Sequence, residues 1–448
     1  AFAGNPLLLS PKRLAEIGLV EAADLAAAQV ADGAKTAAID FETVISNKRA
    51  LLETAFQRLK SGRAPATLSS EFDEFRQTSG EWLEAYAEFM ALREANANRW
   101  WLEWTHYVVE QSRPSPDAKS ALAERIDAHA FWQFLFFRQW KHLRQFAHER
   151  GIQIIGDAPI YVAHDSADVW AHRPWFQLDE AGRPTAVAGV PPDYFCEDGQ
   201  LWSNPLYDWD ALAADGYRWW IQRLQAVLEQ VDLLRLDHFR AFEAYWSVPF
   251  GEPTAVNGTW IPGPRDSFLA AIRDALGEDG NLPIIAAALA MITEEVHELR
   301  RRFDLPGMKV LQFRLPGDSW EPPFTLDEFE PNSVVYTGTH DNDTTLGWFR
   351  SDIEPHPDKL AELRKYTPAD PERIPWEFIE IAWKSSSLLA IAPVQDVLSL
   401  GSDARMNAPG TIGAHNWGWK CSLDALTPEL QQRLRELTEQ TGRLPRSS

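Results

Sequence analysis

The spacing of apolar residues changes near residue 151. From about residue 10 to residue 150, apolar side chains recur every three or four positions, as in "EWLEAYAEFMALREA" (81–95) and "AHAFWQFLFFRQWKHLRQFAHERG" (128–151). This spacing is typical of amphipathic helices. Gly151 follows the last pattern and is expected to end that helix as a C-cap. Residues 1–150 are therefore predicted to form a mainly helical subdomain that no β run interrupts.

After residue 151, short continuous apolar runs alternate with helical segments and loops. Such runs predict parallel strands that helices cover on both faces. The candidate strands are residues 152–157, 231–239, 282–290, 308–313, 333–341 and 388–396. Three of them end in polar clusters, "GDAPIYVAHDS", "RLDHFR" and "GTHDNDT", and such clusters at the carboxyl ends of parallel strands indicate a barrel active site. The pattern favours an α/β barrel, although the six candidate strands are fewer than the eight of a closed barrel.

Length and charge narrow the classes of function. A chain of 448 residues could hold two or three domains, or one α/β barrel with insertions. Its net charge of −22 repels phosphate backbones and anionic lipids, so neither nucleic acid nor a membrane is expected as a partner. The sequence has no signal-peptide pattern and no apolar run near the roughly 20 residues of a membrane span. The two cysteines, Cys196 and Cys421, fit a reducing compartment, and a cytoplasmic location is expected.

The motif "LLRLDHFRAFEAYW" contains a candidate nucleophile. Asp237 lies at the end of a predicted strand, and Arg235, two residues earlier, projects to the same side because side chains alternate along a strand. An arginine beside a carboxylate keeps it ionised and oriented, as nucleophilic attack requires. The alternative is a structural ion pair.

A second polar cluster, "VVYTGTHDNDT", closes another predicted strand. His340 and Asp341 can hydrogen-bond the hydroxyls of a sugar, and the carboxylate can stabilise positive charge at a reacting carbon. Adjacent histidine and aspartate can instead be metal ligands, but no H-x-H or H-E-x-x-H motif accompanies them. No catalytic metal or organic cofactor is expected.

A long proline-rich loop, "VAGVPPDYFCEDGQLWSNPLYDWD", mixes aromatic rings with hydrogen-bonding groups. Rings stack on the apolar face of a sugar while amides and carboxylates bind hydroxyls, so the loop suits a polyhydroxylated ligand. The count of 20 tryptophans in the chain fits the same chemistry. A packed loop without ligand is the alternative. The candidate binding residues are Asp193, Tyr194, Phe195, Trp202 and Asn204.

Together these motifs resemble a known enzyme family. "IIGDAPIYVAHDSADVWAH", "GRPTAVAGVPPDYF", "LPGMKVLQF", "VYTGTHDNDTTLGW" and "QDVLSLGSDARMNAPGT" are similar to motifs of the 4-α-glucanotransferases, also called amylomaltases or disproportionating enzymes, glycoside hydrolase family 77. The similarity extends from "AFAGNPLLLSP" at residue 1 to about Trp419.

The resemblance implies a (β/α)8 TIM-type barrel with inserted helical subdomains that acts on α-1,4-glucans and maltooligosaccharides by a retaining double displacement. In that reaction one carboxylate attacks the anomeric carbon while a second carboxyl group protonates the leaving oxygen. Asp237 matches the nucleophile of the family, Arg235 its orienting partner, and His340 with Asp341 the pair that stabilises the transition state. Further substrate-binding residues are expected within the matching motifs: Asp157, His238 and Asn407.

The general acid/base of the family is missing from its expected position. The family pattern A-E-D-L-G is replaced here by "AAALA", which places Ala287 at the catalytic glutamate, Ala288 at the aspartate and Ala290 at the glycine. A methyl group cannot transfer a proton, so strongly impaired turnover is expected. Other departures near the site are Ala158, Ser203, Ala241 and the segment "HNWGWK". An engineered pocket and a silenced natural relative would both give this pattern.

The start of the chain also departs from the family. The first two barrel strands of the family precede the segment that matches residues 1–6, so these strands are expected to be absent from this chain. Either the chain was cut or its numbering omits upstream residues. Residues 151–448 are predicted to form barrel strands three to eight, with substrate-binding loop insertions at about 158–210.

Three functions remain open on the sequence. The first is a monomeric 4-α-glucanotransferase framework with impaired acid/base chemistry. The second is a protein that binds glucans without catalysis, and the third is a pocket redesigned for another reaction.

Overall fold

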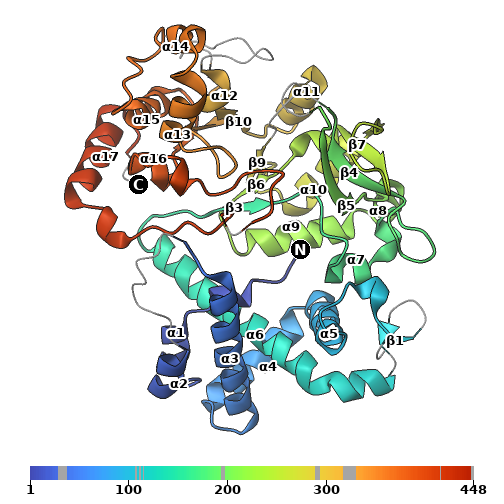
Figure 1. Cartoon of the computed structure of the whole chain (residues 1–448). Helices are drawn as coiled ribbons and strands as arrows, with labels where there is room; N and C mark the ends of the chain where they lie inside the picture. The colour runs from blue at the N-terminus through green and yellow to red at the C-terminus, as the bar shows by residue number, and fades with distance from the viewer. Residues whose placement is uncertain are drawn as a thin grey trace. The chain divides into compact units, whose positions relative to one another are not determined.

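The computed structural model of the chain describes residues 1–28, 38–105, 108–109, 113–114, 116–192, 197–287, 293–315, 329–413 and 415–444. The chain forms two compact units: Ala1–Asp32 with Glu42–Ile284, and Gly33–Phe41 with Ile285–Ser448. Figure 1 shows the elements of both. No helix of these residues is both long enough and apolar enough to span a bilayer.

The first unit begins with helices, as the three- and four-residue spacing predicts. Phe56, Phe72 and Phe131 lie among the buried side chains at their centre. Ion pairs join neighbouring helices at the surface, where Arg125 of α6 contacts Glu53 of α3 at 2.8 Å and Glu94 of α5 at 2.9 Å. The helices are η1 (Pro6–Leu8), α1 (Pro11–Glu16), α2 (Ala22–Ala27), α3 (Phe41–Lys60), α4 (Ala66–Thr78), α5 (Glu81–Ala95), η2 (Trp101–Glu103) and α6 (Pro116–His148).

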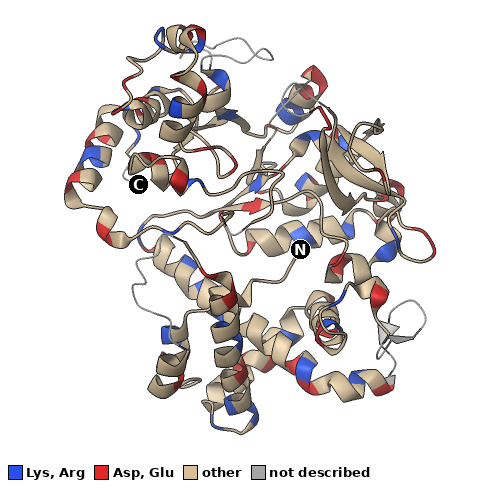
Figure 2. Ribbon diagram, viewed as in Figure 1, with Lys and Arg blue, Asp and Glu red and all other residues tan. Residues whose placement is uncertain are grey.

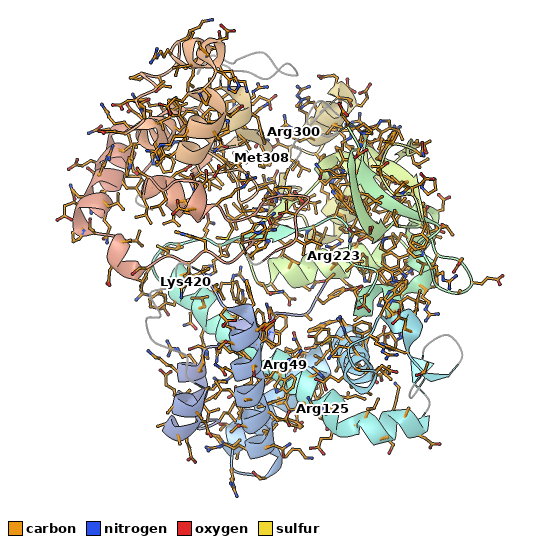
Figure 3. The ribbon with its side chains drawn as sticks, viewed as in Figure 1. Arg49, Arg125, Arg223, Arg300, Met308 and Lys420 are labelled. Atoms are coloured by element: carbon orange, nitrogen blue, oxygen red, sulfur yellow. The ribbon has the colours of Figure 1, made fainter. Side chains whose placement is uncertain are left out.

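Basic and acidic residues are interspersed along these helices (Figure 2). Arg125, which forms the two ion pairs named above, is labelled in Figure 3. Exposed pairs of this kind contribute little to stability, about 0–1 kcal/mol each, so the apolar core dominates the packing of the subdomain.

Gly151 ends the helical region, which confirms the predicted C-cap. Its φ of +68° is the left-handed conformation that glycine adopts at low cost. Its N–H donates to His148 O at 2.9 Å, and the N–H of Ile152 donates to Ala147 O at 3.0 Å. This pair of bonds is a Schellman motif, which satisfies the last carbonyls of α6.

The prediction that no strand interrupts the helical region was wrong. Val108–Val109 (β1) pairs antiparallel with Arg113–Pro114 (β2). Two residues on each side are too few to produce a periodic pattern, so the sequence gives no signal for this hairpin.

Two parallel strands of the first unit, β3 (Ile155–Ala158) and β6 (Leu233–Leu236), pair side by side. Their register places Asp157 directly opposite Arg235. The chain between them contains α7 (Ala167–Ala171), η4 (Arg173–Trp175), α8 (Trp209–Ala214) and α9 (Arg218–Leu228). The predicted strands are confirmed in position, although both are shorter than the apolar runs.

A four-stranded antiparallel sheet forms where no strand was predicted, two of its strands within the predicted loop insertion at about 158–210. Its order is β5-β4-β7-β8, and it is followed by α10 (Arg265–Leu276). The strands are β4 (Ala186–Val190), β5 (Gln200–Pro205), β7 (Ala244–Pro249) and β8 (Thr259–Pro262). Prolines flank or end several of these strands, and all four residues of β8 are exposed, so the alternation that identifies a half-buried strand is missing.

The second unit alternates parallel strands with helices. β9 (Ile284–Ala286) begins at the unit boundary, and β10 (Gly307–Val310) pairs with it and with β11 (Ser333–Tyr336), which pairs with β12 (Leu389–Ile391). The helices are α11 (Glu294–Arg302), α12 (Leu311–Arg314), α13 (Thr345–Trp348), η7 (Phe349–Ile353), α14 (Pro357–Leu363), α15 (Ile374–Lys384), α16 (Val394–Val397), η8 (Ser402–Ala404), η9 (Leu423–Ala425) and α17 (Pro428–Gln440).

All four predicted strands of this unit extend beyond the observed ones, and two of them continue into helices. The apolar run 308–313 is a strand only to Val310 and continues as α12, and the run 388–396 ends as a strand at Ile391 before α16. Apolar residues face the core from either element, so an apolar run alone does not separate the last residues of a strand from a following helix.

The two faces of these strands pack against different partners. Val335 packs in one cluster with side chains of the helices, such as Phe349 and Phe378. The opposite face forms a separate apolar cluster of Ile285, Ala287, Met308, Val310, Val334 and Tyr336. Met308, and Arg300 of α11, are labelled in Figure 3.

Candidate active site

The candidate nucleophile Asp237 lies directly after β6, where Arg235 orients it. Arg235 Nη2 donates to Asp237 Oδ1 at 2.6 Å, and Nη1 donates to Asp157 Oδ2. The arginine side chain is 8% exposed, whereas the aspartate side chains are 41% (Asp157) and 44% (Asp237) exposed. One buried guanidinium therefore fixes two accessible carboxylates at the ends of neighbouring strands.

The side chain of Asp237 is accessible to a ligand. Among the described residues, no donor bonds to Oδ2, while the backbone N–H of Asp237 donates to Ala158 O at 3.0 Å. The backbone and Oδ1 are thus held by β3 and Arg235, while the side chain as a whole is 44% exposed. This arrangement fits a carboxylate nucleophile.

His238, the next residue, packs against Trp202, one of the predicted sugar-binding residues. Its ring lies 4.8 Å from the Trp202 ring, centroid to centroid, in an edge-to-face arrangement at 78°. The backbone of His238 has a φ of +50°, an uncommon conformation for a residue with a side chain. Burial lowers the pKa of His238 to about 4. The imidazole is therefore neutral at neutral pH and can both donate and accept a hydrogen bond.

The predicted binding loop is described in part. Trp202 Nε1 donates to Gln200 Oε1 at 3.1 Å. Asn204 Nδ2 donates to Val162 O at 2.9 Å, which connects β5 to the backbone that follows β3. Between them, Ser203 has a φ of +61°, the region that favours glycine. Three predicted binding residues lie outside the described residues: Asp193, Tyr194 and Phe195.

In the second unit, the chain after β11 contains His340 and Asp341. Asn407 Nδ2 donates to Asp341 Oδ1 at 2.7 Å, and Asn407 N donates to His340 O at 3.1 Å. Arg405 Nη2 donates to Asp341 O at 2.7 Å, and Arg405 Nε donates to Asn407 O at 2.8 Å. The structure thus brings together the three predicted residues His340, Asp341 and Asn407, and it adds Arg405.

Asp396, which had no predicted role, accepts hydrogen bonds from both ends of the loop that contains His340 and Asp341. We call this arrangement the Asp396 clamp. Asp396 of α16 accepts hydrogen bonds from Thr337 Oγ1 at 2.6 Å, Thr345 Oγ1 at 2.7 Å and Thr345 N at 2.8 Å. Burial raises the pKa of Asp396 despite these donors. The segment between the two threonines contains His340 and Asp341. In the sequence, Asp396 appeared only as the last residue of a predicted strand and as part of the motif "QDVLSLGSDARMNAPGT", without a role of its own.

Trp417 was also missed as a partner of the site. Its ring lies 5.2 Å from that of His340 at a tilt of 39°, and its backbone φ is +60°. The sequence marked this segment only as a departure from the family pattern.

Ala287 lies one residue after β9 and is buried in the apolar cluster with Met308, Val310 and Tyr336. Its side chain therefore belongs to the strand face opposite the one packed against Phe349 and Phe378. Ala288 and Ala290 lie outside the described residues. In the described ranges, no three His, Cys, Asp or Glu side chains converge as a metal site.

Comparison with known proteins gives consistent results. A family model described as 4-alpha-glucanotransferase matches residues 1–425. The chain is 46% identical to the 4-alpha-glucanotransferase of Thermus thermophilus, covering 99% of this chain and 87% of that one. It is 45% identical to the 4-alpha-glucanotransferase of Synechocystis sp., covering 99% and 86% respectively.

Solved structures extend the similarity to the fold. The amylomaltase from Streptococcus agalactiae in complex with acarbose matches with a TM-score of 0.90 and 34% identity, over 99% of this chain and 88% of that one. The amylomaltase from Corynebacterium glutamicum shares the fold at a TM-score of 0.76 and 20% identity, over 99% and 66%. These matches confirm the predicted α/β fold class, the TIM-type barrel. The chain belongs to the 4-alpha-glucanotransferase family, glycoside hydrolase family 77.

Proposed function

We propose that the chain is a 4-α-glucanotransferase that transfers segments of α-1,4-glucans between maltooligosaccharides by a retaining double displacement. The observation that carries this proposal is the fixed Arg235–Asp237 pair, because it holds one carboxylate oxygen while the Asp237 side chain stays 44% exposed at a strand end. Membership of the family supports the choice of substrate.

In the first step, Asp237 Oδ2 attacks the anomeric carbon of the donor glucan. The C1–O bond to the leaving sugar breaks as the new C1–O bond to Asp237 forms, and the configuration inverts. In the second step, the hydroxyl of an acceptor sugar displaces Asp237, and the second inversion gives net retention. Arg235 keeps the carboxylate aligned for both steps.

Asp341 and His340 are proposed to stabilise the transition state. The reacting carbon acquires positive charge as the leaving group departs, and a carboxylate favours that charge. Asn407 holds Asp341 through its side-chain amide and His340 through its backbone. Hydroxyl groups of the bound sugar are proposed to bind Asp157, His238 and the loop residues Asp193, Tyr194, Phe195, Trp202 and Asn204.

The leaving sugar must gain a proton and the acceptor hydroxyl must lose one. Ala287 stands at the proposed acid/base position and can do neither, so in this chain water has to supply and take up these protons. General acid/base groups contribute about 10²- to 10⁴-fold, so we expect transfer between natural glucans to be slowed by roughly this factor. The two alternatives are a chain that binds glucans without forming the covalent intermediate, and a pocket redesigned for another reaction. The described neighbours of Ala287 are apolar side chains. They give no support to either alternative over an impaired transferase.

A substrate that needs no acid tests the proposal on the chain as it is. Fluoride leaves α-maltosyl fluoride without protonation, and azide attacks the covalent intermediate without a general base. We expect fluoride release and formation of α-maltosyl azide, with retained configuration. Asp237→Asn should abolish both, while Asp274→Asn, which changes a carboxylate on α10 that is 71% exposed, should leave both unchanged.

Release of fluoride at the same rate in the parent and in Asp237→Asn would overturn the proposed mechanism. Binding of maltooligosaccharides without any fluoride release would establish the binding protein instead. A product other than a retained azide would favour the redesigned pocket.

A further inference from the structure

Trp260 presents an indole ring at the edge of the antiparallel sheet. It belongs to β8, the last strand of the sheet, and it is 38% exposed. A flat indole with an accessible surface can stack on the apolar face of a sugar.

The ring is held in place by two neighbours of the same unit. Trp246 of β7 lies opposite Trp260 in the strand register, and the two ring centroids are 5.2 Å apart at 67°. The Arg240 guanidinium carbon lies 3.9 Å from the Trp260 ring centroid. Trp246 is itself fixed, since its Nε1 donates to Ala255 O at 2.8 Å. The indole is thus preorganised before any ligand arrives.

Arg240 links this ring to the candidate active site. It belongs to η5 (Phe239–Phe242) and follows Asp237 by three positions in the sequence. Its side chain is buried, and its positive charge contributes to the lowered pKa of His238, after burial. Arg240 therefore contacts Trp260 from a turn that begins two residues after Asp237.

We infer that Trp260 is a further subsite for the α-glucan, stacking against a glucosyl unit beyond those bound at Asp237. A polymeric substrate spans several sugar units, and an aromatic platform with one polar handle suits the apolar face of a pyranose. The Arg240 guanidinium is engaged with the ring, and stacking of a neutral sugar on an indole needs no charged partner. This inference rests on the proposed function for the identity of the ligand.

The length of the ligand provides the test. We expect Trp260→Ala to weaken binding of maltoheptaose about tenfold in calorimetry, which corresponds to about 1.4 kcal/mol. Binding of maltotriose should change less than twofold, because a short ligand is retained at Asp237. Trp260→Phe keeps a ring and should recover most of the loss. The control is Phe250→Ala, since Phe250 follows β7 and is 49% exposed.

Each outcome decides one of the two proposals. If the parent binds maltoheptaose but Trp260→Ala binds it equally well, or loses affinity for both sugars alike, the subsite is overturned and the proposed function stands. If the parent binds neither sugar, the proposed function itself fails. Equal melting temperatures for the parent, Trp260→Ala and Trp260→Phe exclude a loss of folding as the cause.

Discussion

Asn407 Nδ2 donates to Asp341 Oδ1 at 2.7 Å, although the two residues are 66 positions apart. The contact fixes one oxygen of the carboxylate and leaves the side chain 38% exposed. A group that must face developing charge in a transition state gains from such a fixed orientation, because no reorganisation is needed during the reaction.

Asn407→Ala tests this relationship. Without the amide, Asp341 can rotate away from its productive orientation, and we expect fluoride release from α-maltosyl fluoride to fall about 10- to 100-fold. Thermal stability should change little, since the contact is partly exposed. The comparison variant is Asn332→Ala, which removes a bond of 2.9 Å to Asp304 Oδ1 just before β11 begins. Equal rates in the two variants would show that Asn407 has no orienting role.

Asp396 should contribute to stability more than any exposed acid of the same unit. Asp396→Ala leaves the hydroxyls of Thr337 and Thr345 and the N–H of Thr345 without their acceptor, and we expect unfolding in urea to become easier by about 3–5 kcal/mol. Asp396→Asn keeps an acceptor and should cost less. A loss below about 1 kcal/mol in the alanine variant would contradict the clamp.

The pH dependence of this contribution has a definite sign. Burial raises the pKa of Asp396 in the folded chain above its unfolded value. The folded state therefore binds the proton more tightly, and the stability from this group is greatest at low pH and is lost as pH rises through the folded pKa. Asp396→Asn should remove that part of the pH profile.

His238 gives the opposite dependence. Its pKa falls from the ordinary value of 6.5 to about 4 in the folded chain, chiefly because of burial. The unfolded state binds the proton more readily, so stability is complete above about pH 6.5 and is lost progressively as pH falls toward 4. The melting temperature should drop over this range in the parent and less in His238→Gln. Parallel profiles for the two proteins would contradict the lowered pKa.

The sequence was sufficient for contacts set by short-range geometry. The period of two along a strand placed Arg235 beside Asp237, and the structure has this contact at 2.6 Å. The proximity of Asp157 to Arg235 depends instead on the register of β3 and β6, which pairs residues 78 positions apart. No local pattern determines that register in advance.

The burial of Asp396 and the strand β8 could not be predicted from the sequence, for a different reason. Aspartate is usually found at the surface. Asp396 is buried because α16 packs beside the loop that begins at Thr337. The strand β8 was missed because its residues are exposed, so burial gives it no alternation. Both cases are set by tertiary packing, which a single sequence encodes only indirectly.

The last prediction concerns restoration of the acid/base. Ala287→Glu would place a carboxyl group beside Met308, Val310 and Tyr336, and apolar surroundings raise the pKa of a carboxyl group, as a general acid at neutral pH requires. If the missing proton donor is the main defect, glucose release from maltotriose should increase. Ala287→Gln has the same shape without a transferable proton, and it should remain at the level of the parent.

Recovery in the single variant should be partial. Ala288 and Ala290 replace an aspartate and a glycine of the family pattern, and they alter the chain that aims the new side chain. A displacement of about 1 Å can cost on the order of 10²-fold in rate, so we expect the triple variant that combines Ala287→Glu with Ala288→Asp and Ala290→Gly to exceed the single one clearly. If all variants fold and none exceeds the parent, the restored side chains do not repair the reaction. The fluoride and azide assay then locates the defect, because release of fluoride without turnover of maltotriose means that Asp237 forms the intermediate and that protonation of the natural leaving group still fails.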